Sequence, residues 1–436
     1  MKRTLILICI VSCFSGAAYL SAAETLDLDG CMDLAVQNNL QLQQEEISLR
    51  TAANESGNVW SYFLPSMSIS AGLTRSDTLF TENMMAGDDP VSYSGGVSLG
   101  LQLNHGVAAS IDRTNIAYQQ AEVQYETVKD RITDTVTSQF YNLIMLQEES
   151  KILEEDLDLA EQQLEKSRIR FQNGLINEQT LLRARLDVES AKLSRSRLLA
   201  EYEQARRSFF STLGIESSAA IELSGEIAPE IVEIEVESLI GEYLGNRTDI
   251  RSAYLQVKQL QAVSRSTKAS SRAPSLSLSG RWNVSPEEVW NANSDSYSLG
   301  LSVSIPVDSW IPGSRDDQSI TSAVSNVEKS RLNLEQVRKQ AELEVRSLAA
   351  ALDQSRQSIQ IARLQEEIAQ RSYDLAEEGF QKGTVERLEL GEIRKELLSA
   401  RQNLLSERYQ YLLSLNELLN ALNLDNPEKL VHVQGE

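Results

Sequence analysis

Three carboxylates in the last quarter of the chain have a spacing that could bind cations. Glu389 and Glu392 lie six and nine residues after Gly383, and Glu386 precedes Glu389 by three. Residues three apart on a helix are surface neighbours, so the three carboxylates share one face within about two turns of a helix that follows Gly383. Such a face attracts cations, but a solvated acidic face without any further role has the same pattern. Spacing alone leaves both interpretations open.

The remaining residues offer no chemistry for catalysis. The chain has two histidines, His105 and His432, and three cysteines, whereas a closed zinc site needs about four nitrogen or sulfur ligands. We find no nucleophile motif, phosphate-binding loop or metal-ligand spacing, so we expect no enzymatic activity, no cofactor and no bound metal. The 63 acidic residues exceed the 41 basic ones and give a net charge of -22. This balance argues against nucleic acid as a partner, because phosphate backbones bind basic surfaces.

The first 23 residues are expected to be a signal peptide. Lys2 and Arg3 precede an apolar run at residues 5–14, and Ser21-Ala22-Ala23 supplies small residues for cleavage before Glu24. The alternative is a lipoprotein box at Ile10-Val11-Ser12-Cys13, with Cys13 lipidated instead. Cleavage before Glu24 leaves Cys31 as the one cysteine, so we expect no intrachain disulfide and a packing role for this residue. No uncharged apolar run of about 18 residues follows, so no membrane-spanning helix is predicted.

The sequence repeats itself with an offset of 209 residues. Residues 64–70 (LPSMSIS) return at residues 273–279 (APSLSLS), and residues 171–174 (FQNG) return at residues 380–383 (FQKG). A shared offset at several landmarks indicates a tandem duplication. We therefore expect a first repeat at residues 24–225, an acidic linker at residues 226–235 and a second repeat at residues 236–436.

Two segments in each half alternate between apolar and small polar residues. They cover residues 66–73 and 97–103, and then residues 276–284 and 299–305. This alternation predicts four strands in two hairpins, each with one apolar face, on which Trp282 could belong to an aromatic girdle. A soluble sandwich has this pattern, but strands of about 9 to 11 residues with an apolar exterior also suit an outer-membrane barrel. Four strands cannot close such a barrel, since the smallest have about eight, so a barrel would require several chains.

Long helical runs fill the rest of each half. We expect long helices at residues 106–172 and 315–381, return helices at residues 177–213 and 386–422, and opening helices at residues 29–62 and 236–272. The long helices would measure roughly 100 Å. An apolar seam with coiled-coil spacing comprises Leu153, Leu157, Ala160, Leu164 and Phe171. Two shorter helices placed end to end match one long helix in height, which suggests a cylinder of helices, although an ordinary coiled-coil array stays open.

Five segments follow one another in the order found in a known family. They are Leu26-Asp27-Leu28-Asp29, Ala35-Val36-Gln37-Asn38-Asn39, Phe63-Leu64-Pro65-Ser66, Leu101-Gln102-Leu103-Asn104-His105-Gly106 and Asn246-Arg247-Thr248-Asp249-Ile250-Arg251. In these segments, in the duplication and in the signal peptide, the chain resembles the TolC family of outer-membrane efflux ducts. The sequence departs from the family at Thr248, where proline is usual. It also departs at the first helix turn (Asn177, Thr180) and near the second (Gly391, Ile393).

The resemblance implies a mostly α fold with a transmembrane β-barrel portion. Tandem-duplicated long-helix hairpins would form a trimeric α-barrel, and each chain would contribute four strands to a shared 12-stranded barrel. The implied location is the outer membrane, with a long periplasmic extension. The implied function is the outer-membrane duct of a tripartite efflux or type I secretion system. The implied partners are two further copies of the chain, outer-membrane lipid, a periplasmic adaptor and an inner-membrane transporter. The alternative is a periplasmic coiled-coil scaffold or adaptor without a membrane barrel.

The resemblance also implies two kinds of functional site. The helix turns at Gly174 and Leu175, and at Gly383 and Thr384, would be tips to which the adaptor docks, although both glycines are first of all helix terminators. Glu389 and Glu392, with a contribution from Glu386, would line a narrow periplasmic entrance as an acidic ring. The equivalent positions in the first half are Thr180 and Arg183, which carry no acid.

Overall fold

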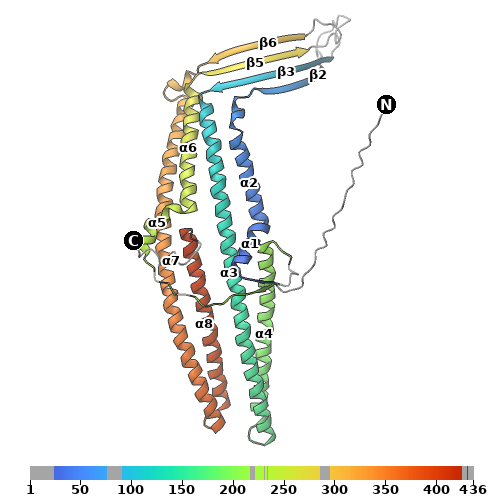
Figure 1. Ribbon diagram of the computed structural model, residues 1–436, viewed down its shortest axis with the longest axis vertical. Coiled ribbons are helices and arrows are strands. Elements are labelled where there is room, and N and C mark those ends of the chain that lie inside the picture. Colours follow the sequence, from blue (N-terminus) through green and yellow to red (C-terminus); the bar gives the residue numbers. More distant parts are fainter. Residues whose placement is uncertain are drawn as a thin grey trace, which may run out of the picture.

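A computed structural model describes residues 24–75, 91–216, 221–229, 231–232, 234–284, 295–424 and 430. The predicted signal peptide, residues 1–23, lies outside the described residues, as does the alternative lipid attachment at Cys13. The described chain is elongated, with a four-stranded sheet at one end and the turns of two helical hairpins at the other (Figure 1). None of the described helices has an apolar stretch long enough to cross a membrane.

The sheet is antiparallel, with the strand order β2-β3-β5-β6. Its strands are β2 (Ser66–Arg75), β3 (Val91–Asn104), β5 (Ser275–Val284) and β6 (Asp295–Ser304). The two predicted hairpins are confirmed as β2–β3 and β5–β6, and β3 joins them by pairing with β5. Within the described chain, β2 and β6 each pair on one side only and so form the two edges of the sheet.

The strands begin where proline ends the preceding helical segment. Pro65 comes directly before β2 and Pro274 directly before β5. The residues preceding them, Leu64 and Ala273, adopt extended backbone conformations with ψ of 143° and 149°. This is the conformation that a following proline favours. The proline therefore fixes the point at which helix gives way to strand in both halves.

The register places like side chains on like faces of the sheet. On one face Leu101 lies opposite Leu278, and Leu278 lies opposite Leu301. On the other face Ser277 lies between Gln102 and Ser302, and its hydroxyl is 2.6 Å from that of Ser302. The predicted alternation is therefore confirmed, and the sheet has one continuous apolar face and one face of small polar residues. The apolar face is uncovered in the chain, since Leu301 has 70% of its surface exposed.

Two long helices and two shorter ones form the helical hairpins. α3 (Gly106–Gln172) has 67 residues and is followed by α4 (Glu178–Leu213), while α7 (Arg315–Lys382) has 68 and is followed by α8 (Arg387–Leu422). The predicted bounds of these four helices agree to within a residue. The predicted seam is buried at Leu153 and Ala160, but Phe171 near the turn is exposed. In the lower half the helices lie in the order α7, α8, α3, α4 (Figure 1).

The two opening helices are each interrupted, which the sequence did not predict. The first divides into α1 (Leu28–Asn38), α2 (Leu40–Gly57) and the 3-10 helix η1 (Val59–Phe63). The second divides into α5 (Val236–Tyr243), the 3-10 helix η2 (Leu244–Asn246) and α6 (Thr248–Arg272). The prediction of uninterrupted helices over residues 29–62 and 236–272 was therefore wrong.

Both interruptions are joints at which an opening helix meets the end of a return helix. Asn39 caps α2 by accepting hydrogen bonds from the amides of Gln41 and Leu42, and its Nδ2 donates to the carbonyl of Thr212 at 2.9 Å. In the second half Arg247 donates from Nη1 to the carbonyl of Ala421 at 3.0 Å. Each contact satisfies a carbonyl that the ending helix leaves free. The end-to-end stacking of short helices beside a long one therefore has a specific polar joint in each half.

The core is concentrated at the level of these joints. One buried cluster packs α1, the middle of α3 and the end of α4 around Cys31, Phe140 and Phe209, next to a short parallel pair formed by β1 (Glu24–Leu26) and β4 (Ile221–Leu223). A second cluster packs α5, α7 and the end of α8 around Leu239 and Tyr411. Cys31 is a free, buried cysteine. Its predicted packing role is thus confirmed.

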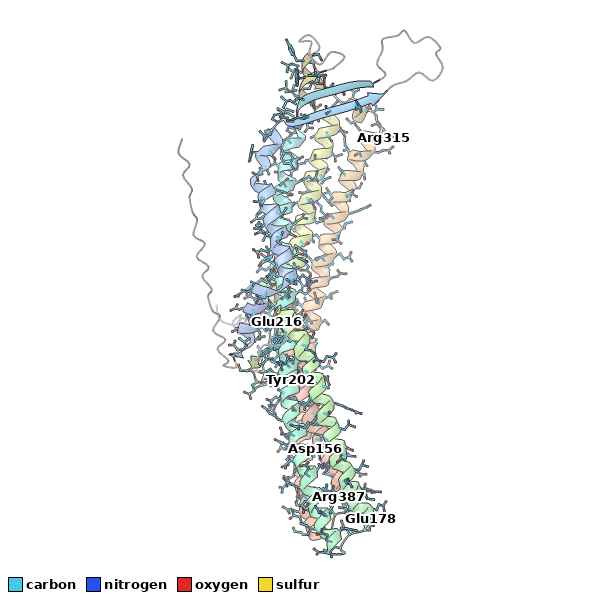
Figure 2. All side chains as sticks on the ribbon, turned by 90° about the vertical axis from the view of Figure 1, so that its right-hand side faces the viewer. Asp156, Glu178, Tyr202, Glu216, Arg315 and Arg387 are labelled. Carbon is cyan, nitrogen blue, oxygen red and sulfur yellow. The ribbon has the colours of Figure 1, made fainter. Side chains whose placement is uncertain are left out.

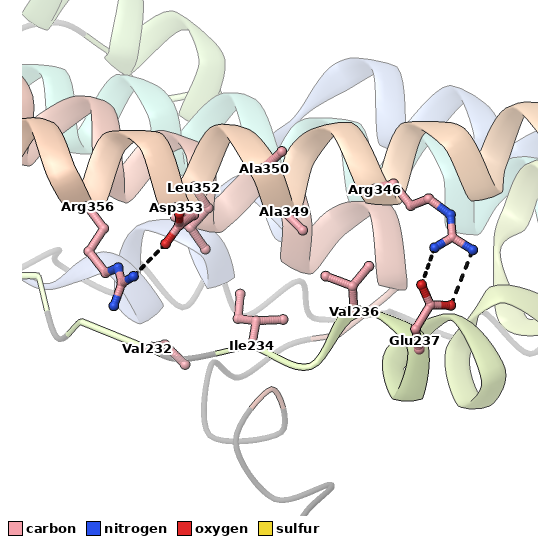
Figure 3. A pocket seen from close by; sticks show the side chains of 10 residues that line it. All are labelled: Val232, Ile234, Val236, Glu237, Arg346, Ala349, Ala350, Leu352, Asp353 and Arg356. Atoms are coloured by element: carbon pink, nitrogen blue, oxygen red, sulfur yellow. Dashed lines mark hydrogen bonds and ion pairs between the residues drawn. The ribbon is translucent and has the colours of Figure 1, made fainter.

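The segment predicted as a linker packs against α7. Val232 and Ile234 line a groove of about 540 Å³ along that helix (Figure 3). Arg346 of α7 holds the start of α5 through an ion pair with Glu237, and Glu342 of α7 pairs with the same guanidinium at 2.7 Å. The amide of Val232 donates to the hydroxyl of Tyr411 at 3.0 Å. These contacts attach the described part of this segment to the second helical hairpin.

Candidate functional site: the hairpin turns and the acidic face of α8

Both hairpin turns contain a glycine in the left-handed region. Gly174 has φ of 69° and Gly383 has φ of 81°. The amide of Leu175 donates to the carbonyl of Arg170 at 2.9 Å, and the amide of Thr384 donates to the carbonyl of Gly379 at 2.9 Å. These are helix-terminating turns of the kind that glycine favours, because a side chain is strained at positive φ. A Cβ at either glycine would meet no atom within 4 Å, so a substitution would strain the backbone without a steric clash.

The two turns present different surfaces. Leu175 projects from the first turn with 71% of its surface exposed, and Asn177 caps α4 by accepting from the amide of Thr180 at 2.9 Å. In the second turn the hydroxyl of Thr384 is turned back to the carbonyl of Gly379 at 3.0 Å. The first turn therefore offers an apolar side chain to a partner, whereas the second offers mainly backbone.

The predicted acidic residues all lie exposed on the first turns of α8. Glu386 is the N-cap residue of that helix, and Glu389 and Glu392 follow on its solvent side. The other side of the helix is buried at Leu390 and Leu397. None of the three carboxylates forms an ion pair with another described residue. The position of Glu386 and Glu389 at the N-cap and in the first turn is favourable, because the helix dipole stabilises negative charge there.

A cleft of about 640 Å³ lies between the two hairpin turns. Glu386 and Glu392 line it together with Arg183 of α4 and Lys395 of α8, whereas Glu389 is not among its lining residues. The structure thus brings two of the three predicted carboxylates to one cleft and leaves Glu389 on the adjoining surface. The cleft carries both signs of charge, which the spacing of the glutamates alone did not indicate.

A row of arginines joins the two hairpins. Arg387, Arg394 and Arg401 are seven residues apart on α8 and pair with acids of α3 and α4. Figure 2 labels Arg387 and, nearer the middle of the molecule, Asp156. The partners of the three arginines are, in order, Asp187 of α4 at 3.1 Å, Asp156 of α3 at 3.3 Å and Glu155 of α3 at 2.9 Å. This row was not among the predicted site residues, although the seven-residue spacing of arginine on a predicted helix is a signal of one helix face.

The middle pair of this row is the most enclosed. Arg394 and Asp156 each expose only 10% of their side chains, and Nε of Arg394 faces Oδ1 of Asp156 without hydrogen-bond alignment. Burial raises the pKa of the Asp156 carboxyl, the charge of Arg394 opposes this effect, and the nearby Asp187 adds to it. Contacts between the hairpins along this row are therefore ionic, in contrast to the apolar seam within each hairpin.

Comparison with known proteins shows to which family the chain belongs. The sequence matches the family described as "Outer membrane efflux protein" over residues 31–214 and again over residues 239–424. The chain belongs to this family. It is an outer-membrane efflux channel with a long helical periplasmic portion, and the resemblance to the TolC family is confirmed. This family consists of transport channels rather than enzymes, and the alternative of a periplasmic scaffold is not favoured.

Individual members of the family are distant in sequence. Outer membrane protein TolC of Vibrio cholerae is 21% identical over 398 residues, which cover 86% of this chain and 85% of that protein. The CmeC outer membrane channel of Campylobacter jejuni has a TM-score of 0.73 at 20% identity, covering 91% of this chain and 85% of CmeC. The open state of the Neisseria gonorrhoeae MtrE channel has a TM-score of 0.71 at 19% identity, covering 91% of this chain and 89% of MtrE. The fold is therefore shared with solved outer-membrane channels.

Proposed function

We propose that three copies of this chain form a passive duct that receives its substrate from an inner-membrane transporter through a periplasmic adaptor. The observation that carries the proposal is the sheet, whose strands have one apolar face, one Ser and Gly face and two unpaired edges, β2 and β6. Open edges are not tolerated in lipid. Pairing β6 of one copy with β2 of the next would close a barrel of twelve strands, and no chemical step is required for passage.

The lateral surfaces of the lower hairpins support a ring of copies. α4 carries an exposed row of leucines, and α7, at the other side of the chain, carries an exposed row of isoleucine and leucine. These residues are Leu182, Leu186 and Leu193 on α4, and Ile361, Leu364, Ile368 and Leu375 on α7. Leu182 and Leu375 each lie eight residues from the glycine of their turn. In a closed ring α4 of one copy would lie beside α7 of the next, and both rows would be buried.

We assign adaptor docking to the two turns and cation attraction to the acidic face. Gly174 and Leu175 would contact the adaptor through the exposed leucine, and Gly383 and Thr384 through the backbone. Glu386, Glu389 and Glu392 would line the periplasmic entrance, where threefold symmetry multiplies their charge and low-dielectric walls focus the field.

We also propose that the chain is a tandem duplication preceded by a cleaved signal peptide at residues 1–23. β2 begins at Ser66 and β5 at Ser275, 209 residues later, and the same offset separates the starts of α3 and α7. The division into residues 24–225, 226–235 and 236–436 fits these offsets.

The assembly is tested in the native membrane. The protein is expected in the outer-membrane fraction as a band that migrates as a trimer without heating and as a monomer after heating. A double variant, Leu182→Cys with Leu375→Cys, is expected to form a covalent ladder up to the trimer on mild oxidation, while each single variant does not. Recovery of the double variant as monomer alone, without any cross-linked species, would reject the ring.

A further inference from the structure

A basic patch lies directly below the sheet, between the start of α3 and the end of α6. It surrounds a cleft of about 460 Å³ lined by Arg265, Lys268 and Arg272 of α6, by Asp112 of α3 and by His105, the N-cap residue of α3. Three basic residues and one acidic residue therefore line the cleft, in a chain whose net charge is -22. This local reversal of charge is not required by the helical packing, because all three basic side chains are exposed.

The basic residues of the patch have more N–H donors than their ion pairs use. They follow one another at intervals of three and four residues and so share one helix face. Arg265 pairs with Asp112 at 2.9 Å, and Arg272 lies 3.8 Å from a carboxylate oxygen of Asp317. Lys268 has no carboxylate within 4 Å in the part of the chain that the structure describes. A guanidinium has five N–H donors and an ammonium three, so an anion in the cleft would find several free donors.

Exposed apolar and aromatic side chains adjoin the patch. The guanidinium of Arg272 lies 5.7 Å from the ring centre of Trp310. Ile305 and Val307 continue the odd-numbered apolar series of β6 beyond the end of that strand, and Trp310 and Ile311 follow, all four exposed. Tryptophan favours the interface between membrane and water. The patch therefore lies at the depth where lipid-facing strands give way to periplasmic helices.

The opposite face of α6 has a different character. Gln256 and Gln259 of α6 accept hydrogen bonds from the side-chain amide of Gln120, the latter at 3.1 Å. Two neutral amides thus lie on that face of α6, whereas the basic side chains of the patch lie on the face where Arg272 contacts the ring of Trp310. This division fits a helix layer with one side toward lipid headgroups and the other toward a neutral polar lumen.

We propose that the cleft binds the phosphate group of an anionic phospholipid in the periplasmic leaflet of the outer membrane. Lys268, Arg265 and Arg272 would donate to the phosphate oxygens, and the acyl chains would lie along Trp310, Ile311 and Val303. Charge complementarity selects an anion, and the adjoining apolar surface selects a lipid over a free ion. The site would fix the depth of the sheet in the membrane, independently of which substrate is exported.

Lipid titration of the purified full-length assembly, followed by native mass spectrometry, tests the proposal. Phosphatidylglycerol is expected to bind more tightly than phosphatidylcholine with the same acyl chains. Each basic residue near a membrane surface contributes roughly a fivefold factor in affinity, so Lys268→Ala should weaken phosphatidylglycerol binding by about fivefold and Lys268→Glu by more. Lys258→Ala is the matched control, because it removes the same charge from α6 about 15 Å further from the sheet, and its affinity should be unchanged.

Several outcomes would overturn the proposal. Equal affinity of wild type and Lys268→Ala for phosphatidylglycerol would show that the lipid does not bind in this cleft. If phosphatidylcholine bound as tightly as phosphatidylglycerol, the negative charge of the lipid would have no role in binding. Displacement of the lipid by millimolar inorganic phosphate would indicate a site for a free anion instead. Trimer yield on unheated gels is measured on the same samples, so a failure of assembly is distinguished from a failure of lipid binding.

Discussion

Cys31 shows how burial controls the reactivity of a single residue. The side chain has no exposed surface and packs among α1, α3 and α4. Burial, with a smaller contribution from the charge of Asp27, raises the pKa of the thiol to about 11. An exposed thiol has a pKa of about 8.5 and reacts as the thiolate. The folded protein should therefore keep this thiol protonated across the neutral range.

Maleimide labelling of the mature chain checks this expectation. The native protein should take up no label between pH 7 and pH 9, whereas an exposed thiol would react increasingly as pH rises through its pKa. After denaturation one thiol per chain should react. The raised pKa also means that ionisation of the thiol above pH 9 favours the unfolded chain, so stability should fall in that range. Rapid labelling of the native protein at pH 8 would contradict the packing.

The acidic face of α8 leads to a second prediction at the residue scale. Glu389 and Glu392 are exposed and have no ion-pair partner among the described residues, so their charge is available to ions. The double change Glu389→Gln and Glu392→Gln should lower cation selectivity in planar-bilayer recordings and weaken block by trivalent cations, because charged rings set selectivity in pores. Trimer yield should not change. Glu407→Gln, further along α8, is the control. Unaltered selectivity in the double variant would contradict a role of this acidic face in ion selectivity.

A substitution in either hairpin turn is expected to strain the backbone without disturbing side-chain packing. Val at Gly174 or Gly383 would strain a left-handed backbone at a cost of about 1–2 kcal/mol without meeting a neighbour within 4 Å. Export should therefore be lost while the trimer forms normally, as measured by substrate accumulation in cells and by unheated gels. Gly57→Val in α2 serves as the control, since that glycine also has open surroundings but an ordinary φ. Normal export by both turn variants would place docking elsewhere.

Two neighbouring residues of β6 are expected to respond differently to substitution by arginine. Leu301 lies on the apolar face and Ser302 on the polar face of β6. Leu301→Arg should cost about 2–4 kcal/mol near the membrane midplane and reduce trimer yield, whereas Ser302→Arg should be tolerated, because its side chain would face water in the lumen. Urea melting of the trimer, followed on unheated gels, compares the two variants. Equal destabilisation by both changes would contradict the assignment of the faces.

Elements set by local sequence signals could be predicted, whereas features that involve contacts between distant residues could not. The alternation at residues 276–284 and the glycines after α3 and α7 are local signals, so the four strands and the bounds of the long helices could be predicted. The starts of two strands could not, since β3 begins at Val91 and β6 at Asp295, before the predicted segments. At the two breaks Asn39 and Arg247 contact Thr212 and Ala421, which lie more than 170 residues away in the sequence, so no local signal indicates these joints. For the same reason the acidic positions of α8 were predictable, but their division between the cleft and the adjoining surface was not.

At the scale of the whole molecule, one polar row holds the two hairpins of a chain together. Arg387, Arg394 and Arg401 bind acids of the other hairpin, while the lateral leucine rows of α4 and α7 remain uncovered. Within the chain these ionic contacts add to the apolar packing of α8 against α3, whereas the uncovered leucine rows would be buried between copies in the proposed ring. A single copy leaves both the sheet edges and these rows exposed, which supports the proposed assembly of three copies.

The mass of the detergent-solubilised protein, measured by light scattering with correction for detergent, tests this claim most directly. We expect a monodisperse particle of three chains, which loses its strand signal in circular dichroism when heat dissociates it. A monodisperse, folded monomer that keeps its strand signal would contradict the shared barrel.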